Sequence, residues 1–390
     1  MIVGVSLEPG PHERRVALVP AVVPLLAKAG HEVLVESGAG ERAGFANRDY
    51  EEQGARLAGN RDALLGAAEV LPMLHGPGDG QLSSDQLRDG QVVVGLLDPL
   101  GTPERARALA ERGTTAFALE LLPRISRAQP MDALTSMATV AGYKAVLLAA
   151  ETLDKMFPLM MTAAGTLTPA RVLVIGVGVA GLQAIATAHR LGAIVQAYDL
   201  RPAVKEQVES LGAKFLELPL ETSDSETAGG YARAMDEEFY RRQRELMGRA
   251  VAESDVVITT AAVPGKPAPR LIPAEAVAAM RSGSVIVDLA AESGGNCELT
   301  RAGETVQTGG VTIIGPRDLA ASVPHHASQM YARNVAAFLG HAIEDGALRL
   351  DPEDEILRDT LVTHGGDVLN GRVRELLGLP PLEAAATGKD

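Results

Sequence analysis

One stretch, residues 171–201, constrains the fold of this chain more than any other (RVLVIGVGVAGLQAIATAHRLGAIVQAYDLR). It begins with a short β-branched run at residues 172–175, which is typical of a buried parallel strand. A G-x-G-x-x-G motif ends that strand, and a helical segment, a second strand and the acid Asp199 follow. This order of strand, glycines, helix, strand and acid predicts a dinucleotide-binding Rossmann unit.

Each glycine of the motif has its own predicted task. Gly176 allows the tight turn after the strand, and Gly178 lets the backbone approach a pyrophosphate. Gly181 lets the helix pack closely on the strand. The N–H groups at the start of the helix then face the phosphates.

The acid at the end of the second strand predicts which dinucleotide binds. Asp199 would accept hydrogen bonds from the adenosine ribose hydroxyls and repel a 2′-phosphate, which favours NAD(H) over NADP(H). Arg201 lies two residues further on and weakens this exclusion slightly. We therefore expect NAD(H) as the cofactor.

Composition excludes several classes of partner. The net charge of −14 argues against nucleic acid and against anionic membrane surfaces. A single cysteine, Cys297, excludes an internal disulfide and fits a reducing compartment. Residues 1–20 lack the pattern of a signal peptide. The apolar run at residues 172–185 is too short to span a bilayer, so we expect no direct membrane insertion.

A second α/β pattern precedes the Rossmann unit. Strands are expected at residues 2–6, 32–36, 70–74, 92–97 and 115–119, alternating with helices at 20–28, 50–57, 61–67 and 104–112. This alternation predicts a parallel sheet with helices on both faces. It contains no G-x-G-x-x-G, so we expect a second α/β domain that is not a second dinucleotide site.

The remaining pattern completes the predicted organisation. Expected elements are a long helix at residues 133–156, a charged helix at 236–252, strands at 256–260, 285–289 and 312–314, a helix at 331–343, and a strand at 356–363 that returns to the first domain. The prediction is α/β: two Rossmann-like doubly wound parallel-sheet domains joined by the long helix, with the cofactor in the cleft between them. The expected domains are residues 1–132 plus 325–390, and residues 133–324.

Two polar loops are candidate parts of the site. Residues 124–132, RISRAQPMD, follow a strand end, where open α/β sheets place ligand groups. Residues 221–230, ETSDSETAGG, are acidic and hydroxyl-rich, which predicts a surface loop. Tyr231 follows this loop, and we interpret it as a candidate lid residue beside the cofactor.

Over nearly its whole length the sequence resembles the soluble NAD(H)-binding component (domain I, the alpha-1 chain) of proton-translocating, Re/Si-specific NAD(P) transhydrogenase, a family itself similar to alanine dehydrogenase. The stretches that carry the resemblance are ERRVALVPA (13–21), RISRAQPMD with AGYKAV (124–146), GVGVAGLQAI (176–185), RPAVKEQVESLGAKF (201–215), ETAGGYA (226–232), ITTAAVPGKPAP (258–269) and VIVDLAAESGGNCE (285–298). The GGYA and RAQ-x-MD stretches point to transhydrogenase.

The resemblance implies an activity and partners. It implies direct hydride transfer from NADH to NADP⁺ held on an NADP(H)-binding partner domain, in a complex with membrane-spanning subunits. It implies a homodimer, to which the apolar face of the helix at residues 331–343 would contribute. It also places the chain in the cytoplasm, peripheral on the inner membrane through its partner subunits.

The resemblance implies site residues, position by position. Arg124, Gln129 and Asp132 resemble the loop that holds the nicotinamide and its ribose, and are the candidate catalytic residues. The full set of candidate cofactor-binding residues is Arg124, Ile125, Ser126, Gln129, Asp132, Gly176, Val177, Gly178, Val179, Gly181, Asp199, Leu200, Arg201, Gly230, Tyr231, Gln243 and Ala262. Pro130 departs from the small polar residue that the family pattern leads us to expect, and Asp132 has the alternative interpretation of a loop cap.

The resemblance to alanine dehydrogenase is incomplete where that enzyme needs its acid–base groups. His75 stands in place of its lysine and Asp98 in place of its histidine, so that only Arg15 matches. Arg15 also has the alternative interpretation of a structural salt bridge. Hydride transfer between two nicotinamides needs closely opposed rings and no general acid or base.

Two other functions remain open from the sequence. One is a free-standing amino- or oxo-acid dehydrogenase, and the other is a nucleotide-binding regulatory module without chemistry. No metal is expected, because His325 and His326 lack a spaced third ligand. Cys297 is interpreted as a packing residue. Lys266 has two interpretations that the sequence leaves open, a contact with a phosphate or a residue of a solvated turn.

Overall fold

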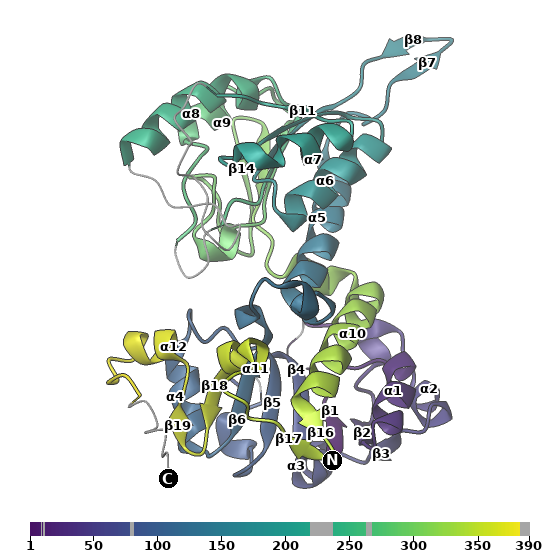
Figure 1. Cartoon of the computed structure of the whole chain (residues 1–390). Helices are drawn as coiled ribbons and strands as arrows, with labels where there is room; N and C mark the ends of the chain where they lie inside the picture. The colour runs from purple at the N-terminus through teal and green to yellow at the C-terminus, as the bar shows by residue number, and fades with distance from the viewer. Residues whose placement is uncertain (9, 11, 79–81, 219–236, 263–266, 383–390) are drawn as a thin grey trace. The chain divides into compact units, whose positions relative to one another are not determined.

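The computed structural model describes residues 1–8, 10, 12–78, 82–218, 237–262 and 267–382. These residues form two compact units (Figure 1). One unit is Met1–Met137 together with Ala321–Asp390, and the other is Ala138–Ala320. The predicted α/β class with two Rossmann-like domains is confirmed by both sheets and by the structural relatives given below.

The first unit is built on an eight-stranded sheet with the order β19-β18-β6-β5-β4-β1-β2-β3. Its strands are β1 (Ile2–Val5), β2 (Glu32–Glu36), β3 (Arg56–Ala58), β4 (Val70–His75), β5 (Val92–Leu96), β6 (Thr115–Ala118), β18 (Leu361–His364) and β19 (Asp367–Val368). Strands β1 to β6 pair in parallel, whereas β18 pairs antiparallel with β6. The C-terminal segment thereby extends the sheet that the N-terminal segment begins.

Helices and a small hairpin complete the first unit. They are α1 (Val23–Lys28), α2 (Asn47–Glu52), α3 (Arg61–Ala67), α4 (Pro103–Glu111), α10 (Pro324–Ala342), α11 (Glu355–Thr360), α12 (Gly371–Leu376) and the pair β16 (Ile343–Glu344) and β17 (Ala347–Leu348). The apolar face of α10 is used inside the unit, because Tyr331, Val335 and Phe338 are fully buried. The expectation that this face contributes to a dimer interface is therefore wrong.

The second unit contains a seven-stranded sheet with the order β11-β10-β9-β12-β13-β15-β14. Its strands are β9 (Arg171–Ile175), β10 (Ile194–Tyr198), β11 (Lys214–Phe215), β12 (Val256–Thr259), β13 (Val285–Asp288), β14 (Thr305–Thr308) and β15 (Val311–Ile314). All neighbours pair in parallel except β14, which is antiparallel to β15. The strand order reverses between β9 and β12, where doubly wound sheets bind their ligands.

Both faces of this second sheet are covered. Helices α5 (Ala133–Thr152), α6 (Val179–Arg190) and α7 (Lys205–Ser210) pack on one face, and α8 (Glu237–Ala252) and α9 (Ala274–Ala278) pack on the other. Burial on both faces explains the continuous β-branched runs of the strands. A separate hairpin of β7 (Met160–Thr162) and β8 (Gly165–Leu167) extends from this unit (Figure 1).

Helix α5 passes from one unit into the other. By length and composition it is the one helix among the described residues that could cross a membrane. It is a different and longer segment than the apolar run at 172–185, which is too short to span a bilayer. Core helices of soluble proteins pass the same test, and Ala145, Val146 and Ala149 are fully buried in the second core. A Cβ on Gly142 would lie 2.1 Å from the Ala180 carbonyl oxygen, so glycine is required where α5 crosses α6.

Candidate functional site

The glycine turn lies at the carboxyl end of β9. Gly176 adopts a left-handed conformation with φ +93°, and a Cβ there would lie 2.7 Å from Thr260 Oγ1. A Cβ on Gly181 would lie 2.0 Å from the Gly176 carbonyl oxygen. Protein contacts therefore require glycine at both positions. A Cβ on Gly178 would meet no protein atom within 4 Å, so this side of the turn is open to a ligand.

The open side of the turn is also the start of α6. Gly178 is the N-cap and supplies no side-chain acceptor, and the first helical bond runs from Leu182 N to Gly178 O at 2.9 Å. The N–H groups of the first turn of a helix have no acceptor within it, and the helix dipole favours negative charge there. The turn and helix start fit a pyrophosphate, as predicted from the sequence.

Asp199, at the end of β10, is buried and fully hydrogen-bonded. Its Oδ2 accepts from Val177 N at 2.7 Å and Arg201 Nη2 at 2.9 Å. Its Oδ1 accepts from Arg201 N and Arg201 Nε, both at 2.9 Å. The carboxylate thus holds the glycine turn and the Arg201 guanidinium together. Ribose hydroxyls that bind to Asp199 must therefore displace or share the contacts of Arg201.

The other candidate residues of the second unit lie around this turn in different environments. Gln243 is buried on α8, and its Nε2 donates to Tyr198 Oη at 2.8 Å, one residue before Asp199. Leu200 and Val179 are half-buried, and Ala262 is exposed after β12. The candidates Gly230 and Tyr231 lie outside the described residues, as does Lys266.

The candidate nicotinamide loop belongs to the first unit. Its middle forms a 3₁₀ segment, Ser126–Met131, in which Arg124, Ser126 and Gln129 are exposed and Ile125 is half-buried. The loop is anchored to the C-terminal part of its unit. Arg127 forms an ion pair with Asp354 at 3.4 Å, and Asn334 Nδ2 donates to the Pro130 carbonyl at 2.8 Å. Pro130, the departure from the family pattern, therefore lies in an anchored segment.

Asp132 caps the long helix in this structure. Its Oδ1 accepts from Thr135 N at 2.8 Å, and its Oδ2 accepts from Thr135 Oγ1 at 2.6 Å. Ser136 N donates to the Asp132 carbonyl at 3.2 Å, as the start of α5. The alternative interpretation of Asp132 as a cap is therefore realised, and contact with a nicotinamide ribose stays a prediction.

A cluster of charged residues occupies the first unit beside β1 and β4. Arg15 is buried, its Nε and Nη2 donate to the two carboxylate oxygens of Glu13 at 2.8 and 2.6 Å, and its Nη2 lies 3.2 Å from His75 Nε2. These contacts hold the pKa of the Glu13 carboxyl well below its usual range, against the opposing effect of burial. The Arg15 guanidinium is thus bound along one edge by Glu13, in the salt bridge considered from the sequence.

Two other carboxyl groups in this unit have pKa values that are raised instead of lowered. Burial raises the pKa of Glu8 to about 7, although its Oε1 accepts from Leu74 N at 2.7 Å. Burial also raises the pKa of Glu120 to about 7. Asp98, whose backbone N donates to Glu120, has a left-handed φ of +50° and accepts from Gly101 N at 3.2 Å. The Asp98 side chain therefore stabilises its own turn.

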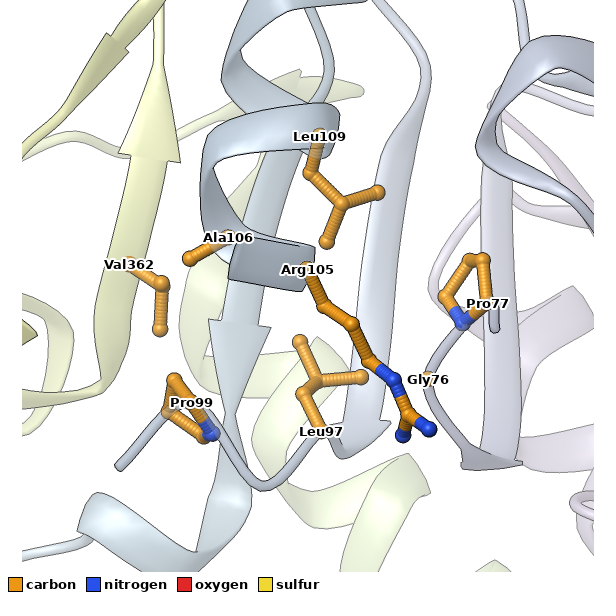
Figure 2. Close-up of a pocket in the computed structure, with 8 residues that line it drawn as sticks. All are labelled: Gly76, Pro77, Leu97, Pro99, Arg105, Ala106, Leu109 and Val362. Atoms are coloured by element: carbon orange, nitrogen blue, oxygen red, sulfur yellow. The ribbon is translucent and has the colours of Figure 1, made fainter. Parts of the chain in front are cut away.

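A small apolar hollow also lies in the first unit (Figure 2). The residues that line it are Gly76, Pro77, Leu97, Pro99, Arg105, Ala106, Leu109 and Val362, and the Arg105 side chain extends towards Gly76. It contains none of the candidate site residues. No motif in the sequence indicates it, and its lining is apolar except for Arg105.

Two residues weighed for other chemistry have structural roles. His325 stacks on Phe45 with ring centroids 4.5 Å apart, and its Nδ1 lies 2.9 Å from the Ala43 carbonyl oxygen. Cys297 is buried, and burial raises the pKa of its thiol. The His325 ring therefore packs against its own unit, and Cys297 is the packing residue that the sequence suggests.

Two sequence profiles match almost the whole chain. Residues 4–141 match "Alanine dehydrogenase/PNT, N-terminal domain" and residues 145–371 match "Alanine dehydrogenase/PNT, C-terminal domain". The chain belongs to the alanine dehydrogenase/PNT family. The resemblance inferred from the sequence motifs is thereby confirmed.

Individual members of the family differ in their similarity to the chain. An alpha-subunit chain of the NAD(P) transhydrogenase of Rhodospirillum rubrum is 45% identical over 376 residues, covering 95% of this chain and 98% of that protein. The crystal structure of transhydrogenase from Sinorhizobium meliloti matches with 44% identity and a TM-score of 0.85, covering 94% of this chain and all of that one. Alanine dehydrogenase of Mycobacterium tuberculosis is 30% identical over 399 residues, covering 99% of each chain.

Proposed function

We propose that this chain is the NAD(H)-binding component of a proton-translocating NAD(P) transhydrogenase, and that it passes hydride from NADH directly to NADP⁺ on a partner domain. Support for the cofactor comes from the glycine turn, the start of α6 and Asp199. Support for the reaction comes from the greater similarity to transhydrogenase than to alanine dehydrogenase.

The observation that decides between the two activities is which groups bind the Arg15 side chain. An amino-acid dehydrogenase needs a cation for the substrate carboxylate and a base for the amine. Here Glu13 binds Arg15 through both carboxylate oxygens, and His75 lies 3.0 Å from the same carboxylate. Asp98 is engaged in its own turn. These residues are arranged as a structural cluster, which favours transfer between two nicotinamides.

In this proposal the chain binds and orients, because no proton has to be moved to or from a substrate heteroatom. The glycine turn and Asp199 bind the adenosine and pyrophosphate half of the dinucleotide. Arg124, Gln129 and Asp132 set the position of the nicotinamide, and the exposure of Arg124 and Gln129 leaves this loop accessible to a partner. The reaction rate then depends on ring-to-ring geometry.

The test compares two assays on one preparation of the chain. We expect hydride transfer between NADH and an NADP analogue when a transhydrogenase NADP(H)-binding domain is supplied, and no NADH formation from alanine and NAD⁺. Alanine oxidation would replace the proposal with the dehydrogenase function. NADH binding without turnover in either assay would indicate a regulatory module.

The proposed assembly is a homodimer that associates with the cytoplasmic face of the inner membrane through membrane-spanning partner subunits. The hairpin β7–β8 supports the dimer, because it exposes Met161 (82%), Leu159 (56%) and Leu167 (48%) on a segment with unpaired strand edges. Light scattering should give twice the chain mass of 40.7 kDa. Met161→Asp should shift the mass towards the monomer, and a monomeric wild-type protein would contradict the dimer.

A further inference from the structure

A buried carboxylate organises the segment that follows β13. Asp288 is fully buried, and its Oδ2 accepts from Asn296 N at 2.8 Å, Cys297 N at 3.0 Å and Thr300 Oγ1 at 2.7 Å. Its Oδ1 accepts from Thr259 Oγ1 at 2.8 Å and Ala290 N at 3.0 Å. Such a set of donors stabilises a charged carboxylate inside a protein and fixes the backbone around Asn296.

The side chain of Asn296 is fully buried and bonds the backbone that follows β12. Its Oδ1 accepts from Ala261 N at 3.0 Å, and its Nδ2 donates to Ala261 O at 2.8 Å and to Pro269 O at 2.9 Å. One amide group thus binds both polar groups of the Ala261 backbone, as a neighbouring strand would. The conformation of Ala261 is therefore set by a residue 35 positions away in the chain.

The segment held in this way touches the glycine turn. Thr260 N donates to Ile175 O at 2.8 Å, and Thr260 Oγ1 donates to Gly176 O at 2.9 Å. Strand β12 lies next to β9 on the side opposite to β10. In a Rossmann fold the dinucleotide crosses the point where the strand order reverses. With the adenosine half at Asp199 after β10, the nicotinamide half lies beside the segment after β12.

We propose that Asn296 is a positioning residue for the nicotinamide half of the dinucleotide, acting through Ala261 and the adjoining Ala262. The inference rests on the proposed NAD(H) function. Asn296 itself is fully buried and its side chain bonds only backbone groups in the hydrogen bonds described above, so its effect is to fix the backbone against which the nicotinamide ribose would rest. Asp288 fixes Asn296 in turn.

The experiment compares Asn296→Ala with a matched control, Gln91→Ala, in the first unit. Gln91 is a buried amide whose Nε2 donates to the carbonyls of Leu65 and Ala68, both at 2.8 Å. Both variants remove a buried amide that binds backbone, so both should lower thermal stability. The dissociation constants of NADH and of ADP, which lacks the nicotinamide half, are measured for each by calorimetry.

For Asn296→Ala we expect the NADH dissociation constant to rise by about tenfold, and that of ADP to stay within about twofold. Hydride transfer at saturating NADH should fall by a further factor of about ten, because the ring position is no longer fixed. Gln91→Ala should leave the dissociation constants of NADH and ADP and the rate of hydride transfer unchanged. An equal loss of NADH and ADP affinity, or no selective loss, would overturn the positioning role.

A second measurement does not depend on whether the variant folds. In the wild-type chain without nucleotide, the Ala261 amide should exchange its hydrogen slowly, because Asn296 already binds it. Exchange at the rate of an open loop would overturn the proposal. A wild-type chain that binds ADP but not NADH, or neither, would instead refute the proposed NAD(H) function, so that the two failures are distinguishable.

Discussion

Replacement of Asp199 by asparagine tests the adenosine side of the site most directly. The variant keeps the size of the side chain and one oxygen, but puts an NH₂ group where the other oxygen accepts hydrogen bonds. In the wild-type protein the two oxygens accept four, from Val177 N and from three nitrogens of Arg201. Two of these donors would then face another donor.

The size of the effect follows from the groups involved. Hydrogen bonds to a charged group contribute about 1.5–3 kcal/mol, and neutral ones about 1 kcal/mol. Loss of one carboxylate acceptor for the ribose hydroxyls should therefore weaken NADH binding by about 1–3 kcal/mol, or roughly 5- to 150-fold. The same substitution should lower stability by about 1–3 kcal/mol, since the pair with Arg201 is buried.

The assay is a titration of nucleotide fluorescence, with thermal unfolding measured on the same samples. Asp255→Asn is the control, because Asp255 is a buried acid of the same unit that accepts from Arg171 N and Lys155 Nζ, both at 2.8 Å. It precedes β12 and so lies at the opposite edge of the sheet from Asp199. Asp255→Asn should lose stability and keep NADH affinity. If Asp199→Asn behaves in the same way, Asp199 holds only Arg201 and the turn.

Three further predictions concern the loop, the charged cluster and the helix crossing. Asp132→Asn should keep the cap of α5 and change NADH affinity by no more than about tenfold, while it slows hydride transfer by more than about tenfold. Asp132→Ala should in addition lower the free energy of unfolding by about 1 kcal/mol, because the cap is lost. Equal losses of rate and affinity in Asp132→Asn would mean that the loop only holds the cofactor. Burial raises the pKa of Glu8 to about 7, so between about pH 4.5 and pH 7 the native state holds a proton that the unfolded chain has lost. The free energy of unfolding of the wild type should therefore fall as the pH rises through this range, by on the order of 3 kcal/mol relative to Glu8→Gln. Parallel curves of stability against pH for the two proteins in urea unfolding would refute this. Gly142→Ala should destabilise by about 1–3 kcal/mol, because its Cβ would lie 2.1 Å from Ala180 O, whereas Gly248→Ala in α8, where a Cβ meets nothing within 4 Å, should be neutral or stabilising in the same thermal unfolding measurement.

Most strands of both sheets were predictable because their pattern is local. Residues 32–36 and 194–198 form β2 and β10 with the expected bounds. The expected helix at 50–57 was wrong at its end, since the chain turns at Gly54, with φ +94°, and residues 56–58 form β3. The expected strand at 356–363 begins as α11, capped by Asp354, and only its end pairs with β6. Strand β14 was missed because its residues are mostly exposed and lack apolar alternation.

The glycine turn of the candidate site was equally predictable, because the left-handed turn at Gly176 and the contact of Gly181 with Gly176 are local features of the chain. The additional contact of Gly176 with Thr260 was not visible in the sequence. The partners of the charged groups were not. Sequence reasoning assigned Asp199 to a ribose without its bonds to Arg201, and it assigned no role to Asn296 or Thr260. A polar residue in a loop carries no local sign of which distant backbone group it will bind.

The sequence by itself determined the family, the α/β class and the place of the nucleotide turn, since strand runs, glycine spacing and helix periodicity act over short distances along the chain. Only the tertiary structure decided that Glu13 forms a salt bridge with Arg15, that Asp132 caps α5 and that Asn296 forms hydrogen bonds with the Ala261 backbone. These contacts depend on which strands become neighbours in a sheet and on where their carboxyl ends meet. Desolvation makes each buried polar group find a partner, and the fold decides which partner is within reach.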